Sequence, residues 1–261
     1  MADLTLRPTQ IGGLDIVKPD EIEWINFLIY GEPGVGKTVL SASASAVEEM
    51  SPVLLVDGEA GTLSIRDRYP GVDVIKIKHY GELVVIRDAI AKGEVPYKTV
   101  ILDSITEIAK IGMDDIMIRA VAKAREEGAN RDPDLPGIGE WGKSANQIRK
   151  LVRSFKLLPI HFIMTALSQV DTKKPSRPVT KPDLSGKLAE AMPGQLDEVF
   201  YMYNKEDKVP DSEEVITNRY ILTAQHGNII AKDRSGNLPL AMKNPTMQLI
   251  MDTMRNAEVD N

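Results

Sequence analysis

The chain has 261 residues, and its 43% hydrophobic and 27% charged residues are ordinary for a soluble globular protein that buries a sizeable core. Its net charge of -6 argues against a protein that holds nucleic acid by bulk charge alone, although it leaves room for a local basic groove. Cysteine is absent, which excludes disulfides, zinc–thiolate sites and thiol catalysis.

The first half of the chain alternates short apolar runs with helical patterns. Residues 1–23 have a mixed composition with Gly12, Gly13 and Pro19, and we expect an N-terminal arm or cap there. Buried strands are predicted at residues 24–30, 53–57, 73–77 and 99–103. Helices are predicted at residues 37–50, 80–92 and 105–127.

The second half contains two long irregular segments, at residues 128–140 and 171–186. Loops of this length are uncommon in a compact domain and are usually functional or disordered. A helix is predicted at residues 141–157 and a strand at residues 160–166. Three short strands, at residues 197–203, 219–224 and 228–231, and a closing helix at residues 245–257 are expected to follow.

Strands that alternate with helices predict right-handed βαβ units on a mainly parallel sheet, which the last three strands are expected to extend antiparallel. No linker divides the sequence, so one α/β domain is expected over residues 24–261.

No apolar run reaches the roughly 18 residues of a membrane span, and the N-terminus MADLTLRPTQ lacks the pattern of a secretion signal. His79, His161 and His226 are too dispersed to predict a metal site. We therefore expect a soluble cytoplasmic protein without a membrane partner.

Residues 31–38, GEPGVGKT, fit the full phosphate-loop pattern between a predicted strand and a predicted helix. Glycines let successive backbone N–H groups point at phosphate oxygens, while Lys37 reaches the β- and γ-phosphates and Thr38 binds Mg²⁺. ATP and Mg²⁺ are therefore the expected cofactors. The expected nucleotide contacts in this segment are Gly31, Glu32, Pro33, Gly34, Val35, Gly36, Lys37, Thr38 and Val39.

Polar side chains at the ends of three strands are further candidates. Asp103 ends the strand TVILD and is the natural second partner of Mg²⁺, unless it only caps the next helix. Glu59 is expected to polarise the attacking water, with Asp57 as the competing candidate. Thr165 is a candidate sensor of the γ-phosphate, or else a buried hydroxyl bonded to the backbone.

The second irregular segment is basic, which suits a phosphodiester backbone, although a solvated surface loop has the same composition. The candidate nucleic-acid contacts are Lys173, Lys174, Arg177 and Lys181. Lys232 and Arg234 follow the last strand pair, and basic residues so placed are able to reach a neighbour's nucleotide.

This set of motifs resembles the RecA-like recombinase ATPases, most closely the small phage nucleotide-binding proteins that act as single-strand annealing proteins. The resemblance covers about residues 24–240. VDGEAG at 56–61 is similar to the segment with the water-activating Glu, which points to Glu59, and ILDSI at 101–105 is similar to the metal-binding strand. AKDRSG at 231–236 resembles the basic pair that reaches a neighbour's ATP across a filament interface, which points to Lys232 and Arg234 as catalytic.

The resemblance implies a RecA-like P-loop NTPase core and a DNA-dependent ATPase that binds single-stranded DNA for recombination or annealing. It also implies a homo-oligomer or filament in the host cytoplasm of a phage, with a phage single-strand-binding or replication protein as a further candidate partner. The irregular segments 128–140 and 171–186 fall where the two DNA-binding loops of such proteins are expected.

Leu167 stands where the phage relatives often have His, so the sensor role passes to Thr165, Ser168 or Gln169. Two other functions stay open: a loader or motor ATPase that acts on a replication protein, and an ATP-gated interaction module with negligible turnover.

Overall fold

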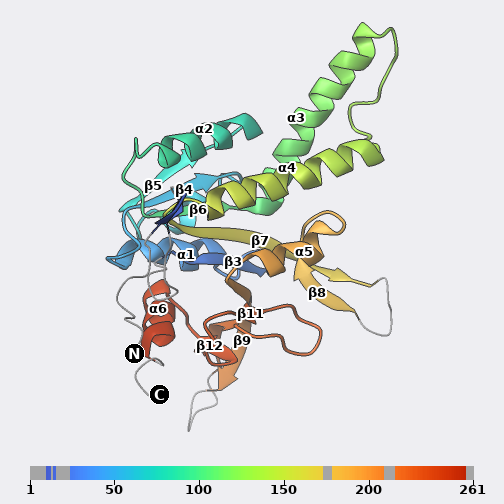
Figure 1. Cartoon of the computed structure of the whole chain (residues 1–261). Coiled ribbons are helices and arrows are strands. Elements are labelled where there is room, and N and C mark those ends of the chain that lie inside the picture. Colours follow the sequence, from blue (N-terminus) through green and yellow to red (C-terminus); the bar gives the residue numbers. More distant parts are fainter. Residues whose placement is uncertain (1–9, 13, 16–23, 173–177, 209–214, 257–261) are drawn as a thin grey trace, which may run out of the picture.

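The computed structural model describes residues 10–12, 14–15, 24–172, 178–208 and 215–256. Ten described strands form one sheet (Figure 1). In chain order they are β3 (Asn26–Gly31), β4 (Val53–Asp57), β5 (Val72–Lys76), β6 (Thr99–Asp103), β7 (His161–Asp171), β8 (Val179–Pro182), β9 (Glu198–Lys208), β10 (Val215–Leu222), β11 (Lys232–Asp233) and β12 (Ala241–Lys243). A separate pair, β1 (Gln10–Ile11) and β2 (Leu14–Asp15), falls within the expected N-terminal arm.

The sheet order is β12-β10-β9-β3-β7-β6-β4-β5, with β11 paired to β9 and β8 paired to β7. Six neighbouring strands of the sheet, in the spatial order β9-β3-β7-β6-β4-β5, run parallel. The strands β10, β11 and β8 pair antiparallel with their neighbours. The α/β class with a mainly parallel sheet and antiparallel C-terminal strands is thus confirmed, and it is the architecture of a P-loop NTPase core.

Helices cover both faces of the sheet (Figure 1). The described helices are α1 (Lys37–Ala42), η2 (Ser43–Ala46), η3 (Thr62–Ser64), α2 (Tyr80–Ala91), α3 (Ile105–Glu126), α4 (Ile138–Lys156), α5 (Leu188–Gln195) and α6 (Met247–Asn256). The helices α1 and α6 pack on one face, and α2, α4 and α5 pack on the other. None of them is both long and apolar enough to cross a membrane.

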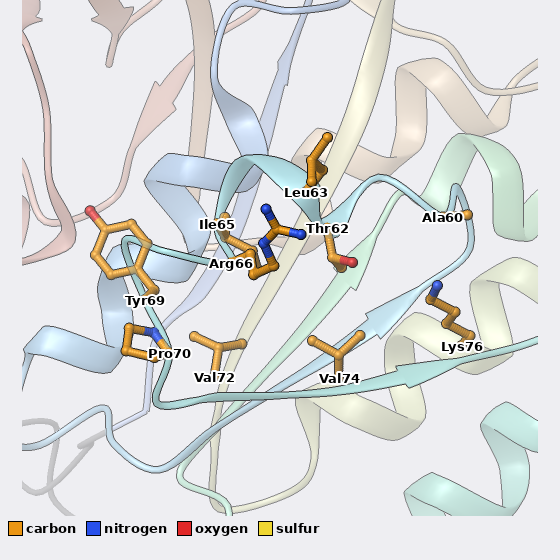
Figure 2. A pocket seen from close by; sticks show the side chains of 10 residues that line it. All are labelled: Ala60, Thr62, Leu63, Ile65, Arg66, Tyr69, Pro70, Val72, Val74 and Lys76. Carbon is orange, nitrogen blue, oxygen red and sulfur yellow. The ribbon is translucent and has the colours of Figure 1, made fainter.

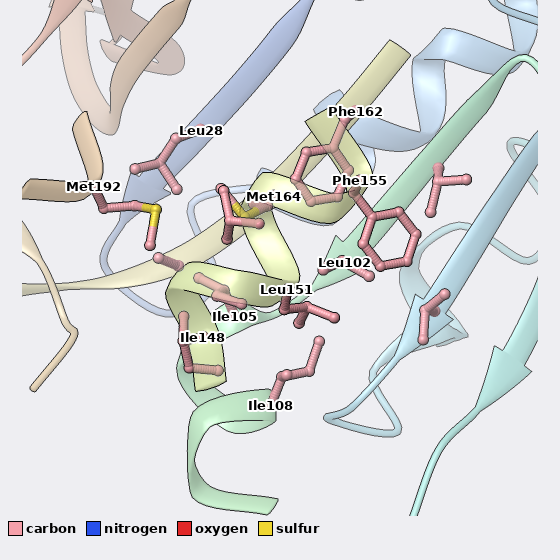
Figure 3. Packing of buried hydrophobic residues seen from close by; sticks show 14 of the residues in the cluster. Leu28, Leu102, Ile105, Ile108, Ile148, Leu151, Phe155, Phe162, Met164 and Met192 are labelled. Carbon is pink, nitrogen blue, oxygen red and sulfur yellow. The ribbon is translucent and has the colours of Figure 1, made fainter. Parts of the chain in front are cut away.

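Alternation along the strands divides the core between these faces. Leu28 and Met164 point to the side of α4 and α5, where they join Leu151 and Phe155 (Figure 3). Phe27, Ile29 and Phe200 point to the side of α1 and α6. Because successive side chains of a strand face opposite ways, a strand covered by helices on both sides is apolar throughout. This is why short continuous apolar runs predicted the central strands.

Helices α3 and α4 pack against each other and extend outward, so that the segment between them lies away from the sheet (Figure 1). The first irregular segment is shorter than predicted, because α4 begins at Ile138, where Glu140 accepts a hydrogen bond from the Gly137 N–H (3.1 Å). The expected single helix over 37–50 is instead α1 followed by the 3₁₀ helix η2.

The structure corrects three further expectations in the C-terminal half. Strand β9 joins β3 in parallel, so antiparallel pairing begins one strand later than predicted. The segment 171–186 contains β8, which pairs with an extended β7. The strand predicted at 228–231 is reduced to isolated bridges at Ile229, and the strand that pairs with β9 is β11.

Candidate functional site

The phosphate-loop segment joins β3 to α1 at the carboxyl end of the parallel strands. Gly34 and Gly36 have φ angles of 78° and 106°, a region that favours glycine. A Cβ atom at Gly31 would lie 2.2 Å from the backbone oxygen of Met202 in β9. The glycines of the motif are thus required by the backbone path and by the neighbouring strand.

Lys37 lies inside this loop. Its Nζ donates hydrogen bonds to the backbone oxygens of Gly31 (3.0 Å) and Glu32 (2.9 Å). Burial lowers the pKa of Lys37, and the carboxylates of Glu59 and Asp103 act in the opposite direction. The cation is therefore held at the centre of the loop, within the field of the two carboxylates that the sequence singled out.

The two predicted Mg²⁺ ligands are in direct contact. Asp103 is 4% exposed at the end of β6 and accepts hydrogen bonds from the hydroxyls of Thr165 and Thr38. Burial raises the pKa of Asp103, while these hydroxyl bonds lower it. A hydroxyl and a carboxylate suit Mg²⁺, which is usually bound by few protein oxygens together with phosphate and water. The residues present therefore fit this ion.

Asp57 and Glu59 have different environments at the end of β4. Asp57 is 2% exposed, and its Oδ1 accepts the N–H groups of Glu59 (2.9 Å) and Gly61 (3.4 Å). Glu59 is exposed, and its carboxylate accepts a hydrogen bond from the Ser104 hydroxyl, beside Asp103. Asp57 therefore shapes the turn, and Glu59 is the carboxylate that faces outward.

Thr165 is fully buried and its hydroxyl is bonded to Asp103. It supports the position of that carboxylate, and its contact with the γ-phosphate stays a prediction. Three positions further along β7, the Ser168 hydroxyl donates to the Glu32 carboxylate in the phosphate loop (2.8 Å). Of the three candidate γ-phosphate sensors, Thr165, Ser168 and Gln169, it is Ser168 whose side chain contacts the phosphate loop.

Lys232 and Arg234 lie away from the phosphate loop, toward the amino ends of β3 and β9. Lys232, in β11, pairs with Val199 of β9, and Val199 in turn pairs with Leu28 of β3. The phosphate loop begins three residues further along β3, at Gly31. Lys232 Nζ donates to the Leu196 backbone oxygen (2.6 Å).

Arg234 forms an ion pair with Asp197 (2.6 Å) beyond the start of β3. The length of β3 from Asn26 to Gly31, about 16 Å at roughly 3.3 Å per residue, therefore separates Arg234 from the phosphate loop. The chain therefore does not bring this pair to its own phosphate loop.

Three of the four candidate nucleic-acid contacts, Lys173, Lys174 and Arg177, lie outside the described residues. The fourth, Lys181, differs from the expectation. It is 4% exposed and its Nζ forms ion pairs with Asp171 (2.5 Å) and Glu190 (3.5 Å). A buried and paired cation is not available to a phosphodiester backbone, so Lys181 has a structural role.

Two features near the site were missed in the sequence. The side chain of Arg219, from β10, lies against Gly36 of the phosphate loop. A cavity of about 520 Å³ extends from Ala60 along β5, lined by Leu63, Val74 and Lys76 among others (Figure 2). No local motif marks Arg219, because its position depends on the pairing of β10 with β9.

A family model described as "AAA domain" matches residues 24–235, which include every described residue of this site. No curated protein matches the chain.

Proposed function

The chain belongs to the AAA-domain family of P-loop ATPases, and we propose that it uses ATP and Mg²⁺ to control its binding of single-stranded DNA. The finer assignment is a RecA-like recombinase or annealing ATPase of the phage type, working as an oligomer or filament. The observation that carries the proposal is the meeting of Lys37, Thr38, Asp103 and Glu59 at one sheet edge, beside the hairpin of β7 and β8.

Each residue of this group has a distinct task. The loop N–H groups and Lys37 hold the phosphates, while Thr38 and Asp103 hold Mg²⁺, which neutralises phosphate charge when bound. Glu59 polarises the attacking water, because it is the exposed carboxylate next to Asp103. Its hydrogen bond from Ser104 keeps the carboxylate in place.

The proposed link to DNA runs along β7. This strand pairs with β3 as far as Gly31 and then continues into the antiparallel hairpin with β8. The hairpin is joined to the phosphate loop by the bond from Ser168 to Glu32. Residues 173–177 lie between β7 and β8 in the sequence. We propose that a change at Glu32 acts on DNA binding through β7.

The positions of Lys232 and Arg234 support a site shared between two copies. Neither residue lies at its own chain's loop, and Arg234 is 55% exposed. We assign both to the nucleotide of a neighbouring copy, where they stabilise charge on the transferred phosphate.

The test is binding of single-stranded DNA over a series of salt concentrations, with and without a non-hydrolysable ATP analogue. We expect the analogue to raise the affinity, and the affinity to fall steeply as salt increases, because phosphate contacts release counterions. Affinity that does not respond to the analogue contradicts the proposal. Absence of binding favours an ATPase that acts on a protein partner.

A further inference from the structure

A groove of about 310 Å³ lies between α2 and α4, which pack against each other on the face of the sheet opposite to α1 and α6 (Figure 1). Its lining residues are Tyr80, Val84 and Arg87 from α2 and Gln147, Lys150, Leu151 and Ser154 from α4. None of them belongs to the phosphate loop or to the candidate site. The volume lies at the lower end of the roughly 300–1,000 Å³ of ligand pockets, so the groove suits a short segment of a larger partner.

The wall and the floor of the groove are apolar, and Tyr80 joins its two helices. The Tyr80 hydroxyl donates a hydrogen bond to the Gln147 backbone oxygen (2.9 Å). The Tyr80 ring packs against α3, where a Cβ atom at Gly112 would lie 3.3 Å from its Cδ2. Leu151 is 3% exposed at the floor, whereas Val84 is 38% exposed and offers an apolar wall. An apolar side chain that enters the groove is removed from water, which favours binding.

The rim of the groove is basic, although the chain as a whole has a net charge of -6. From Trp141 to Lys156, α4 contains no acidic residue and five basic ones, which are Lys143, Arg149, Lys150, Arg153 and Lys156. Lys150 and Arg153 are exposed, and within the described part of the chain neither has an ion pair. These two charges are therefore available to a partner.

The acidic side chains of α2 have partners of their own. Glu82 accepts hydrogen bonds from two backbone N–H groups at the start of the helix. Asp88 forms an ion pair with Arg87 (2.8 Å) and so balances that cation. Lys150 and Arg153 consequently give the groove its positive sign.

Ammonium and guanidinium groups attract both carboxylates and phosphates, and the apolar lining distinguishes between the two kinds of ligand. A single strand of nucleic acid is held by aromatic faces on which its bases stack. Among the described residues that line the groove, Tyr80 is the one aromatic residue, and its ring and hydroxyl are already engaged. An aliphatic groove beside positive charge suits a peptide that combines an apolar side chain with carboxylates.

We propose that the groove between α2 and α4 is a docking site for an acidic segment of a partner protein. One apolar side chain of that segment lies between Val84 and Leu151, and its carboxylates meet Lys150 and Arg153 on the rim. The inference goes beyond the proposed function, because no residue of the groove takes part in nucleotide binding or in the proposed contacts with DNA. It provides a way to attach the ATPase to another protein while the phosphate loop stays free.

The experiment measures the dissociation constants of short synthetic peptides in which Asp and Glu residues surround one central residue, which is Leu, Phe, Met or Ala. The proteins are the wild type, Lys150→Glu, which reverses a charge of the rim, and Val84→Asn, which makes the wall polar without adding charge. The matched control is Arg125→Glu, which reverses the charge of an exposed arginine on α3 outside the groove. Thermal unfolding verifies that each variant is folded, and ATP hydrolysis should be the same in all of these proteins.

Wild type should bind the Leu, Phe or Met peptides at least about tenfold more tightly than the Ala peptide, because a larger apolar side chain is buried. Lys150→Glu should weaken every peptide by about tenfold or more, and added salt should weaken binding to the wild type. Val84→Asn should reduce the preference for a large central residue, and Arg125→Glu should match the wild type.

A wild type that binds none of the peptides, or that binds the Ala peptide as tightly as the others, overturns the inference. Equal affinities in Lys150→Glu and wild type overturn it as well. Single-stranded DNA is the alternative ligand. If DNA binds the wild type and loses affinity in Lys150→Glu while the peptides do not bind, the rim belongs to a nucleic-acid surface and the inference is wrong. Each of these outcomes leaves the ATPase intact, since hydrolysis is measured separately in the same proteins.

Discussion

At the scale of single residues, the decisive contrast is between two carboxylates that stand two positions apart. Asp57 is buried and bonded to the backbone of its own turn, whereas Glu59 is exposed and bonded to Ser104. The sequence left the choice between them open, because both follow the same strand. The hydrogen bonds give Asp57 a structural task, and we therefore propose the catalytic role for Glu59.

Glu59→Gln should therefore keep nucleotide affinity and lower the hydrolysis rate by at least about a hundredfold, the usual scale of a lost general base. Steady-state ATP hydrolysis and equilibrium ATP binding measure the two effects separately. The matched variant Asp57→Asn should lower the melting temperature, since its carboxylate holds two backbone N–H groups. Normal turnover in Glu59→Gln moves the role to another residue.

Glu198 is a second residue whose environment is expected to have a measurable effect, in this case on the pH dependence of stability. It is 1% exposed, its Oε1 accepts the Arg234 N–H (3.2 Å), and its Oε2 has no partner among the described residues. Burial raises the pKa of Glu198 to about 8, and the nearby Asp233 carboxylate adds to this effect. In the unfolded chain the pKa is about 4.3.

Between these two pKa values the folded state binds more protons than the unfolded state. The free energy of unfolding consequently falls as the pH rises through this window. Glu198→Gln removes this dependence, so its melting temperature should equal that of wild type near pH 5 and exceed it by about 3 °C or more at pH 8.5. Parallel pH profiles of the two proteins would contradict the assignment.

At the scale of elements, α4 is held on the sheet by one apolar face. Phe155 stacks on Phe162 of β7 with a centroid distance of 5.1 Å and an interplanar angle of 8°. Ile148, Leu151 and Val152 complete this face, while Leu157, just beyond the helix, is 76% exposed. These four apolar residues follow the 3.6-residue spacing of one helix face.

Phe155→Ala should lower the free energy of unfolding by about 3–5 kcal/mol, because it leaves a cavity between α4 and the sheet. Chemical denaturation measures this difference. Leu157→Ala, just beyond the end of the same helix, should change stability by less than about 0.5 kcal/mol because that side chain is exposed. Similar losses in both variants would show that packing on this face does not hold the helix.

The parallel strands β3, β4 and β6 and the first half of β7 could be predicted because burial on both faces makes them continuous apolar runs. The strand predicted at 73–77 exists as β5, but the expectation that it is buried was wrong, because β5 is the edge strand and its Val74 and Ile75 are exposed. Strand β8 and helix α5 were missed for physical reasons. The sequence of β8 is VTKP, whose lysine is buried only because Asp171 and Glu190 neutralise it. Helix α5 contains Pro193, and it is stabilised by packing of Leu188 and Met192 on the core.

In the candidate site, too, some residues could be predicted from the sequence and others could not. The phosphate loop, Asp103 and Glu59 could be found because local spacing encodes them. Arg219 and Ser168 could not, since their positions depend on which strands pair in the folded sheet. The direction of β9 also depends on its partner β3, and no pattern within β9 specifies it.

At the scale of the whole molecule, the sheet separates the phosphate loop from Lys232 and Arg234. If two copies share one site, a Lys37→Ala protein and a Lys232→Ala/Arg234→Ala protein are each inactive but complementary. Mixing them should restore ATP hydrolysis to at least about a tenth of the wild-type rate, as expected when catalytic groups act across an interface. Arg125→Ala in place of the double variant serves as the control for mixing.

No recovery in the mixture, with each variant folded, would place the nucleotide site within a single copy. In that case Lys232 and Arg234 serve only to hold the start of β9, through Leu196 and Asp197.

The central claim is that ATP hydrolysis and single-stranded DNA are coupled, and one measurement tests it most directly. ATP hydrolysis is followed with and without single-stranded DNA, in wild type and in Lys37→Ala. The account predicts strong stimulation by DNA in the wild type and no hydrolysis in the variant, which should remain folded. Hydrolysis that is indifferent to DNA would contradict the account and point to a protein partner instead.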